Sequence, residues 1–164
     1  MRMRIGKVFV LALALMVVGA CSQGSAIEIG QKAPDFSLAD INGEMVSFAS
    51  FSGKVVILDF FASWCPPCRQ EIPGFIELEK SYGDKGFAMI GMAVESAGAA
   101  KEFAGKMGIN YPVLVDDGSA SKIYGPIRSI PTTFIIDKSG KMVKMYIGSR
   151  EKAVFEADIK ELLK

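Results

Sequence analysis

The longest strand-like pattern in the chain is Val55–Phe61, with the sequence VVILDFF, which is almost continuously apolar. Such a run predicts a central strand that is covered on both faces. Its single charge is Asp59, which would then be a buried carboxyl group. A second apolar run, Phe87–Val94, predicts another strand, and Ala97–Met107 has the spacing of a helix.

Turn residues divide the rest of the sequence into short elements. Phe36–Ala39 and Met45–Phe48 flank Asn42-Gly43, a strong hairpin signal, so the domain should open with an antiparallel hairpin. The remaining predicted elements are helices at Arg69–Tyr82, Ser119–Tyr124 and from about Arg150, and strands at Tyr111–Val115, Thr132–Asp137 and Lys141–Ile147, the last two joined around Ser139-Gly140. Pro73 predicts a kink or break in the first helix, and Ser149 is the expected N-cap of the last. Alternating strands and helices predict an α/β fold with a central mixed β-sheet flanked by helices.

Composition narrows the possible functions. The 164 residues suffice for one domain, and 50% hydrophobic with 23% charged residues is typical of a packed protein. The net charge of +1 implies no basic surface for nucleic acid. The chain has no histidine, which disfavours Ser-His-Asp and Cys-His hydrolases and histidine-ligated zinc or copper sites.

The start of the chain has the order of a secretory signal. Three cations, Arg2, Arg4 and Lys7, precede an apolar run over Val8–Val18 and then small residues. The run is shorter than the roughly 20 apolar residues of a spanning helix, although an uncleaved anchor or a buried helix is the alternative. We therefore expect a signal peptide at residues 1–20, a tether at 21–28 and one folded domain at 29–164.

Val18-Gly19-Ala20-Cys21 is similar to a bacterial lipobox, in which the cysteine is lipidated and becomes the mature N-terminus. Lipid chains contribute roughly 0.8 kcal/mol per buried CH₂, so lipid on Cys21 would hold the domain at a membrane, on its periplasmic or cell-envelope face. A chain starting there has 16 basic and 18 acidic residues, a net charge of −2. Setting Cys21 aside also leaves the other two cysteines as a pair.

That pair lies in Trp64-Cys65-Pro66-Pro67-Cys68, between the central strand and a predicted helix. A cysteine at a helix start lies beside unsatisfied backbone N–H groups and the positive end of the helix dipole, which favour the thiolate that attacks disulfides. The second cysteine, one turn further along, can resolve a mixed disulfide. The two prolines suit the first helical turn and stiffen it.

Together with Ala33-Pro34-Asp35-Phe36 and Ile130-Pro131-Thr132-Thr133-Phe134, this motif resembles the thioredoxin-fold thiol-disulfide oxidoreductases related to ResA and TlpA. The resemblance covers the chain from about Gly30 to Lys164. It implies a thioredoxin-like fold, protein-disulfide oxidoreductase activity without a cofactor, Cys65 as the exposed attacking thiol and Cys68 as the buried resolving thiol.

The same resemblance implies how a substrate is bound. Pro131 matches the family's cis-proline facing the disulfide, the alternative being an ordinary trans proline. The loop at Ile130-Pro131 would offer backbone groups to an extended substrate segment, with Pro66 and Pro67 on its other side. Trp64 would flank the sulfurs as a partly exposed platform, or else pack in the core.

Carboxylates are the expected proton carriers, because histidine is absent. Asp59 matches the buried acid of thioredoxins, and burial should raise its pKa. Relatives nearest to ResA instead use a glutamate three residues after the second cysteine, present here as Glu71, which can approach Cys68 on one helix face. Glu95 resembles a further acidic position near the site. The alternative for both glutamates is a solvated surface charge, which is the favoured interpretation for Glu95, and the proton route between Asp59 and Glu71 is open.

Two other functions are to be weighed. A peroxidase of the peroxiredoxin type would need Pro and Thr or Ser where Leu58 and Ala62 stand, and rapid peroxide consumption would reveal it. A copper-delivery protein resembling Sco would need ligands beyond the two sulfurs; tight copper binding by the reduced protein would reveal it. The candidate soft ligands are apolar-strand methionines, for which core packing is commoner: Met89, Met92, Met142 and Met145.

The expected partners are disulfide-containing exported proteins as substrates, a membrane thiol-disulfide electron donor, and the membrane itself through Cys21. Cytochrome c maturation is one pathway that the resemblance implies. The direction of electron flow depends on reduction potentials, so an oxidant or isomerase role is open from the sequence alone.

Overall fold

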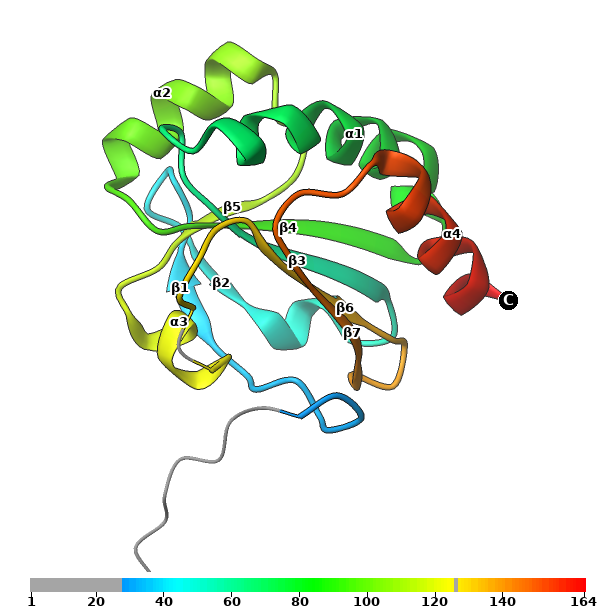
Figure 1. Ribbon diagram of the computed structural model, residues 1–164. Coiled ribbons are helices and arrows are strands. Elements are labelled where there is room, and N and C mark those ends of the chain that lie inside the picture. Colours follow the sequence, from blue (N-terminus) through cyan, green and yellow to red (C-terminus); the bar gives the residue numbers. More distant parts are fainter. Residues whose placement is uncertain (1–27, 126) are drawn as a thin grey trace, which may run out of the picture.

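The central sheet dominates the computed structural model, which describes residues 28–125 and 127–164 (Figure 1). Within that part of the chain its strand order is β5 (Val113–Val115), β4 (Phe87–Ala93), β3 (Val55–Phe61), β6 (Thr132–Ile136) and β7 (Met142–Ile147). The strands β3, β4 and β5 are parallel, and β6 and β7 are antiparallel to their neighbours. The predicted mixed α/β sheet of a thioredoxin-like fold is confirmed.

The predicted N-terminal hairpin is also confirmed, as β1 (Ser37–Ala39) paired with β2 (Met45–Ser47). The Asp40 carboxylate accepts hydrogen bonds from the backbone N–H groups of Asn42 and Glu44 at 2.8 and 2.9 Å, and so closes the loop. Gly43 has φ +88°, which a residue with a side chain rarely adopts. A 3₁₀ turn, η1 (Phe48–Phe51), connects this hairpin to the main sheet.

Helices cover both faces of the sheet (Figure 1). On one face lie α1 (Pro66–Tyr82), α2 (Ala97–Met107) and α4 (Lys152–Leu163); on the other lie α3 (Ser119–Ile123) and the hairpin. A short 3₁₀ turn, η2 (Gly83–Lys85), links α1 to β4. Among the helices of the described ranges, none combines the length and apolar character needed to cross a bilayer.

Three local predictions about the helices are wrong. The helix α1 starts at Pro66 rather than Arg69, and it continues through Pro73, so of the predicted kink or break the break does not occur. An internal proline costs about 3 kcal/mol, but Ile72 and Phe75 on either side of it are fully buried, and that packing holds the helix together. The last helix starts at Lys152, so Ser149 is not its N-cap.

Strand β3 divides the core into two hydrophobic clusters, because alternate side chains point to opposite faces. Val56, Leu58 and Phe60 pack on the side of the hairpin and α3. Val55, Ile57 and Phe61 pack on the side of α1 and α4. By the same alternation Asp59 points to the face that α1 covers, and it is directly paired with Gly91 on β4 and Thr133 on β6.

Residues 1–27 include the predicted signal peptide, the lipobox and Cys21, and they lie outside the described residues. The proposed leader, lipid anchor and start of the tether therefore stay sequence predictions.

Gly91 offers a test of how tightly the sheet packs beside Asp59. A Cβ at this position would lie 3.0 Å from a ring carbon of Phe61 and 3.3 Å from one of Tyr111, and both rings are buried. We expect Gly91→Ala to lower the free energy of unfolding by about 1–3 kcal/mol, as overpacking does. Urea denaturation of the disulfide form measures it.

The matched control is Gly105→Ala in α2, where an added Cβ meets open space. Here the better helix propensity of alanine should raise the free energy of unfolding by about 0.5–1 kcal/mol. Equal effects of the two substitutions would contradict the tight packing around Gly91.

Candidate active site

The two redox cysteines lie where β3 turns into α1. Cys65 has extended backbone angles and is the N-cap of the helix, so its Sγ accepts a hydrogen bond from the Cys68 N–H at 3.3 Å. The sulfurs of Cys65 and Cys68 form a disulfide. Pro66 and Pro67 have no N–H, so the Cys68 N–H is the donor that this helix start offers to the sulfur; with the positive end of the helix dipole, it would stabilise a thiolate at Cys65.

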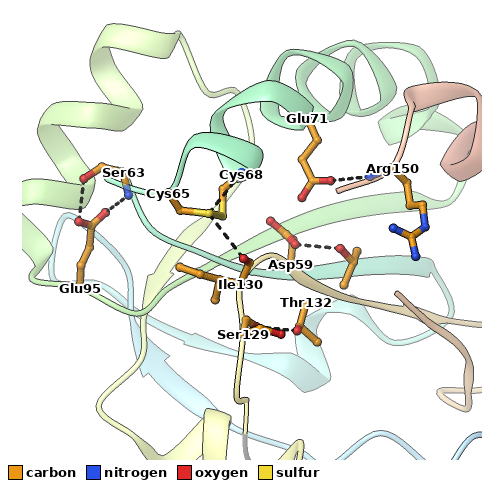
Figure 2. The surroundings of a disulfide bond; sticks show 11 residues. Asp59, Ser63, Cys65, Cys68, Glu71, Glu95, Ser129, Ile130, Thr132 and Arg150 are labelled. Atoms are coloured by element: carbon orange, nitrogen blue, oxygen red, sulfur yellow. Dashed lines mark hydrogen bonds between the residues drawn. A yellow bond between two sulfur atoms is a disulfide. The ribbon is translucent and has the colours of Figure 1, made fainter. Parts of the chain in front are cut away.

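Exposure of the sulfurs differs from what the family resemblance implied. Cys65 was expected to be exposed, but it is only 3% exposed, and Cys68 is fully buried. The reason is that Cys65 Sγ is bonded to Cys68 and lies 3.7 Å from the carbonyl oxygen of Ile130, which covers it (Figure 2). Trp64 is 68% exposed beside them, which agrees with a surface platform rather than core packing.

The loop opposite the disulfide is held by its own hydrogen bonds. The Ile130-Pro131 bond is cis, as the motif predicted, and Pro131 is buried. The Thr132 hydroxyl donates to the Ser129 carbonyl at 2.8 Å, and the Gly148 N–H donates to the Pro131 carbonyl at 2.8 Å. These bonds fix the direction of the Ile130 carbonyl toward the sulfur.

A surface groove of about 400 Å³ adjoins this loop. Its apolar lining includes Trp64, Val94, Ile127 and Ile130, and its charged lining residues are Asp116 and Arg128. Trp64 immediately precedes Cys65, and the Ile130 carbonyl lies against its sulfur, so the groove adjoins the disulfide. Pro66 is exposed at the helix start, and Pro67 is half-buried.

Both predicted acids are brought beneath the disulfide. Asp59 is 1% exposed and its Oδ1 accepts a hydrogen bond from the Thr133 hydroxyl at 2.9 Å. Burial raises the pKa of Asp59 well above its ordinary value, the charge of Glu71 raises it further, and the Thr133 hydrogen bond opposes these effects. The prediction that Asp59 is buried is confirmed, and its role in proton transfer stays a proposal.

Glu71 is buried as well, so it is not the solvated charge that the sequence left open. It is 6% exposed, on the inner face of α1 with Cys68, and its Oε2 accepts a hydrogen bond from the Arg150 N–H at 3.2 Å. Burial raises the pKa of Glu71 to about 7, against the opposing effects of the Arg150 N–H and guanidinium. Its side chain and that of Asp59 point toward one another (Figure 2).

Glu95 has a definite structural role that the sequence did not predict. Its two carboxylate oxygens accept hydrogen bonds from the Ser63 N–H and the Ser63 hydroxyl, each at 2.7 Å (Figure 2). Ser63 immediately precedes Trp64 and Cys65, so the carboxylate at the end of β4 holds the turn that carries the redox pair.

The sequence also missed Arg150 and Thr133 as partners of the two acids. Thr133 belongs to the motif after Pro131, but its position opposite Asp59 depends on the register of β6 against β3. Nothing in the local sequence around Arg150 indicates that its backbone N–H meets a side chain of α1. Among residues 28–125 and 127–164 there is no cluster of three or more acidic, cysteine or histidine side chains arranged to hold a metal ion.

Comparison with known proteins agrees with this geometry. The sequence profile of the AhpC/TSA family matches residues 29–145. Thiol-disulfide oxidoreductase ResA of Bacillus thuringiensis is 37% identical over 139 residues, 83% of this chain and 79% of that protein. Thioredoxin-like protein YneN of Bacillus subtilis is 37% identical over 79% of this chain and 78% of its own length.

A solved structure of a thiol:disulfide interchange protein of the thioredoxin family, from Chlorobium tepidum, superposes with a TM-score of 0.78. It is 37% identical and covers 85% of this chain and 100% of its own. The thioredoxin-like fold thus extends over the whole region that carries the candidate site.

The bonds between Glu95 and Ser63 can be tested through stability. Glu95→Ala leaves the part-buried Ser63 N–H without an acceptor, which should cost about 1–3 kcal/mol in free energy of unfolding. Ser63→Ala removes only the hydroxyl bond and should cost less, about 0.5–1.5 kcal/mol. Urea denaturation of both variants in the disulfide form gives the comparison; a larger loss for Ser63→Ala would contradict the role of Glu95 as an acceptor for the backbone.

Proposed function

The chain belongs to the AhpC/TSA family and is a thiol-disulfide oxidoreductase, and from this premise we propose that it reduces disulfides in exported proteins outside the cytoplasm. The observation that carries the proposal is the Cys65–Cys68 pair at the start of α1, with the Cys68 N–H directed at Cys65 Sγ. That arrangement favours a thiolate at Cys65 and a hidden second sulfur at Cys68.

Exchange follows from the different surroundings of the two sulfurs. In the reduced protein, the Cys65 thiolate attacks a client disulfide, forms a mixed disulfide and releases one client thiolate. Cys68 then attacks Cys65 Sγ, releases the second client thiolate and closes the disulfide. Two electrons pass to the client, and a membrane thiol-disulfide donor returns them to the pair.

The groove beside Ile130 is where we place the client. An extended segment lying along it would find the Ile130 backbone on one side of the sulfur and Pro66 and Pro67 on the other, a local form of strand addition. The exposed Trp64 offers an apolar surface next to the client cystine. In the disulfide form Cys65 is only 3% exposed, so the donor that reduces the pair must displace part of this cover to reach the sulfur.

Proton transfer at Cys68 is assigned to the buried carboxyl groups. Asp59 and Glu71 lie on the same face as Cys68, and no histidine exists in the chain to take this part. A base whose pKa lies near neutrality transfers protons efficiently, and the environment of Glu71 satisfies this condition.

The location of the protein is proposed from the start of its sequence. Arg2, Arg4 and Lys7, the apolar run after them and Val18-Gly19-Ala20-Cys21 favour export followed by lipidation of Cys21. The domain would then act at the periplasmic or cell-envelope face of a membrane, held there by lipid. Cytochromes c undergoing maturation are one client class, proposed from the resemblance to ResA-type reductases.

Trapping tests the exchange mechanism. A Cys68→Ser variant cannot resolve the mixed disulfide, so exported proteins should accumulate on Cys65 in cells and be identified by mass spectrometry after purification without reductant. The matched control, Cys65→Ser, lacks the attacking sulfur and should accumulate few or none. If Cys68→Ser traps no exported protein, exchange with such clients is not what the pair does.

The redox state of the Cys65–Cys68 pair in cells tests the direction of electron flow. Alkylation after acid quenching should find the Cys65–Cys68 pair of the parent protein mainly as thiols, because a reductant is kept reduced by its donor. A pair found mainly as the disulfide would instead identify an oxidant.

Membrane attachment tests the location. The parent protein should sediment with membranes and carry lipid on Cys21, whereas Cys21→Ala should lose the lipid. Metabolic labelling with a fatty acid and fractionation of the cells measure both. Labelling that persists in Cys21→Ala would contradict the assignment of the lipidated residue.

A further inference from the structure

The two buried acids beneath the disulfide differ in what surrounds them. Asp59 is 1% exposed in the middle of β3, and the groups that act on its carboxyl within the described part of the chain are the Thr133 hydroxyl and the Glu71 charge, neither of them a cation. A carboxylate in such a place would have lost its hydration with no positive partner. The neutral, protonated form of Asp59 is therefore favoured.

Glu71 has the surroundings of a group that can carry charge. Its Oε2 accepts the Arg150 N–H, and the guanidinium of the same residue favours the anion. It also lines a surface pocket of about 290 Å³ between α1 and the segment before α4, together with Gln70, Gly74 and Ser149. A proton on Glu71 thus has a route to solvent that Asp59 lacks.

The remaining oxygen of Glu71 links the two acids. Oε1 is buried and has no hydrogen-bond partner among the donors of the described residues. An unpaired buried carboxyl oxygen is costly. The Asp59 and Glu71 carboxyl groups point toward one another (Figure 2), and Asp59 uses Oδ1 for Thr133, so a proton on its other oxygen is directed at Glu71.

We propose that Asp59 keeps its proton throughout the redox cycle and donates it as a hydrogen bond to Glu71 Oε1, while Glu71 carries the exchangeable proton between Cys68 and solvent. This deepens the proposed function and rests on it. Asp59 is then a positioning residue that acts through Glu71, and Glu71 is the base.

Glutathione disulfide serves as the probe substrate for the reduced protein. The Cys65 thiolate attacks the probe, forming a mixed disulfide and releasing one glutathione thiolate. The Glu71 carboxylate takes the Cys68 thiol proton, and the Cys68 thiolate attacks Cys65 Sγ and displaces the second glutathione thiolate. Glu71 loses the proton to solvent through the pocket at Gly74 and Ser149, and Asp59 ends as it began.

Other titratable groups face this pair from the neighbouring elements. They are Cys68 from α1, Tyr111 from the segment before β5, and Arg150 from the segment before α4; Glu79, further along α1, acts on Tyr111. Burial and the nearby carboxyl charges raise the pKa of Tyr111 well above its ordinary value, so it stays neutral. The Glu79 Oε2 accepts a hydrogen bond from the Met89 N–H at 2.8 Å. Glu71, with a pKa of about 7, is thus the carboxyl group of the pair expected to titrate near neutrality.

Isosteric amides separate the two roles. Asp59→Asn retains a donor toward Glu71 and an acceptor for Thr133, so the pH profile of Cys68 attack should keep its apparent pKa near that of the parent. Glu71→Gln removes the base and should slow this step by about 100-fold or more and abolish the pKa near 7. The measurement is the single-turnover release of the second glutathione thiolate from glutathione disulfide, followed over pH.

Asp59→Leu removes the donor to Glu71, so the apparent pKa of the Cys68 step should rise because the Glu71 anion loses a hydrogen bond. Recovery of the parental profile in Asp59→Asn then shows that this hydrogen bond matters. If Asp59→Asn loses the pH dependence while Glu71→Gln keeps it, Asp59 is the base and the proposal is overturned.

Infrared spectroscopy gives a readout that does not depend on activity. Above about pH 8, where Glu71 is ionised, the oxidised parent should retain the carbonyl band of one protonated carboxylic acid. The band should persist in Glu71→Gln and disappear in Asp59→Asn. Its absence from the parent overturns the proposal, whereas failure of the trapping experiment in cells would overturn the client assignment and leave the carboxyl roles standing.

Discussion

The site depends on the burial of β3 over its whole length between β4 on one side and β6 on the other. Backbone pairing on both edges leaves this strand no freedom to shift, because a slip of one residue would turn its apolar side chains from one cluster to the other. Asp59 is therefore held on the face under α1, and the chain that leaves Phe61 delivers Cys65 to the helix start. The sulfurs and their acid come from one short stretch of rigid backbone.

The redox turn is stabilised from outside that stretch. Glu95, at the end of the neighbouring parallel strand, binds Ser63, and the loop at Ile130 approaches Cys65 from β6. Parallel strands place their carboxyl ends at one edge of a sheet, so β3 and β4 naturally bring Ser63 and Glu95 together. The helix start supplies the remaining contact, the Cys68 N–H on Cys65 Sγ. The turn that carries the Cys65 sulfur is therefore contacted by groups from three separate segments of the chain.

Much of this could be predicted from local patterns. The apolar run at Val55–Phe61 and the helix at Ala97–Met107 have the predicted boundaries, since strong periodicity is a local property. The break predicted at Pro73 does not occur, because the penalty of a helix proline is local, whereas the burial of Ile72 and Phe75 that outweighs it comes from contacts distant in sequence. The Ser149 prediction failed for a similar reason. A local cap preference carries no information about tertiary contacts such as the hydrogen bond from the Arg150 N–H to Glu71 of α1, and the helix starts only at Lys152.

The amino-acid sequence by itself determined the redox chemistry, since two cysteines at a strand-to-helix junction in a chain without histidine leave few alternatives. It also determined the α/β class through its periodicity. The environment of each group was decided only by tertiary structure. Whether Glu71 is solvated or buried, and which partners Asp59 and Glu95 meet, depends on strand register and on segments more than thirty residues apart in sequence. Burial and charge proximity are properties of the packed molecule, and they set a carboxyl group's pKa.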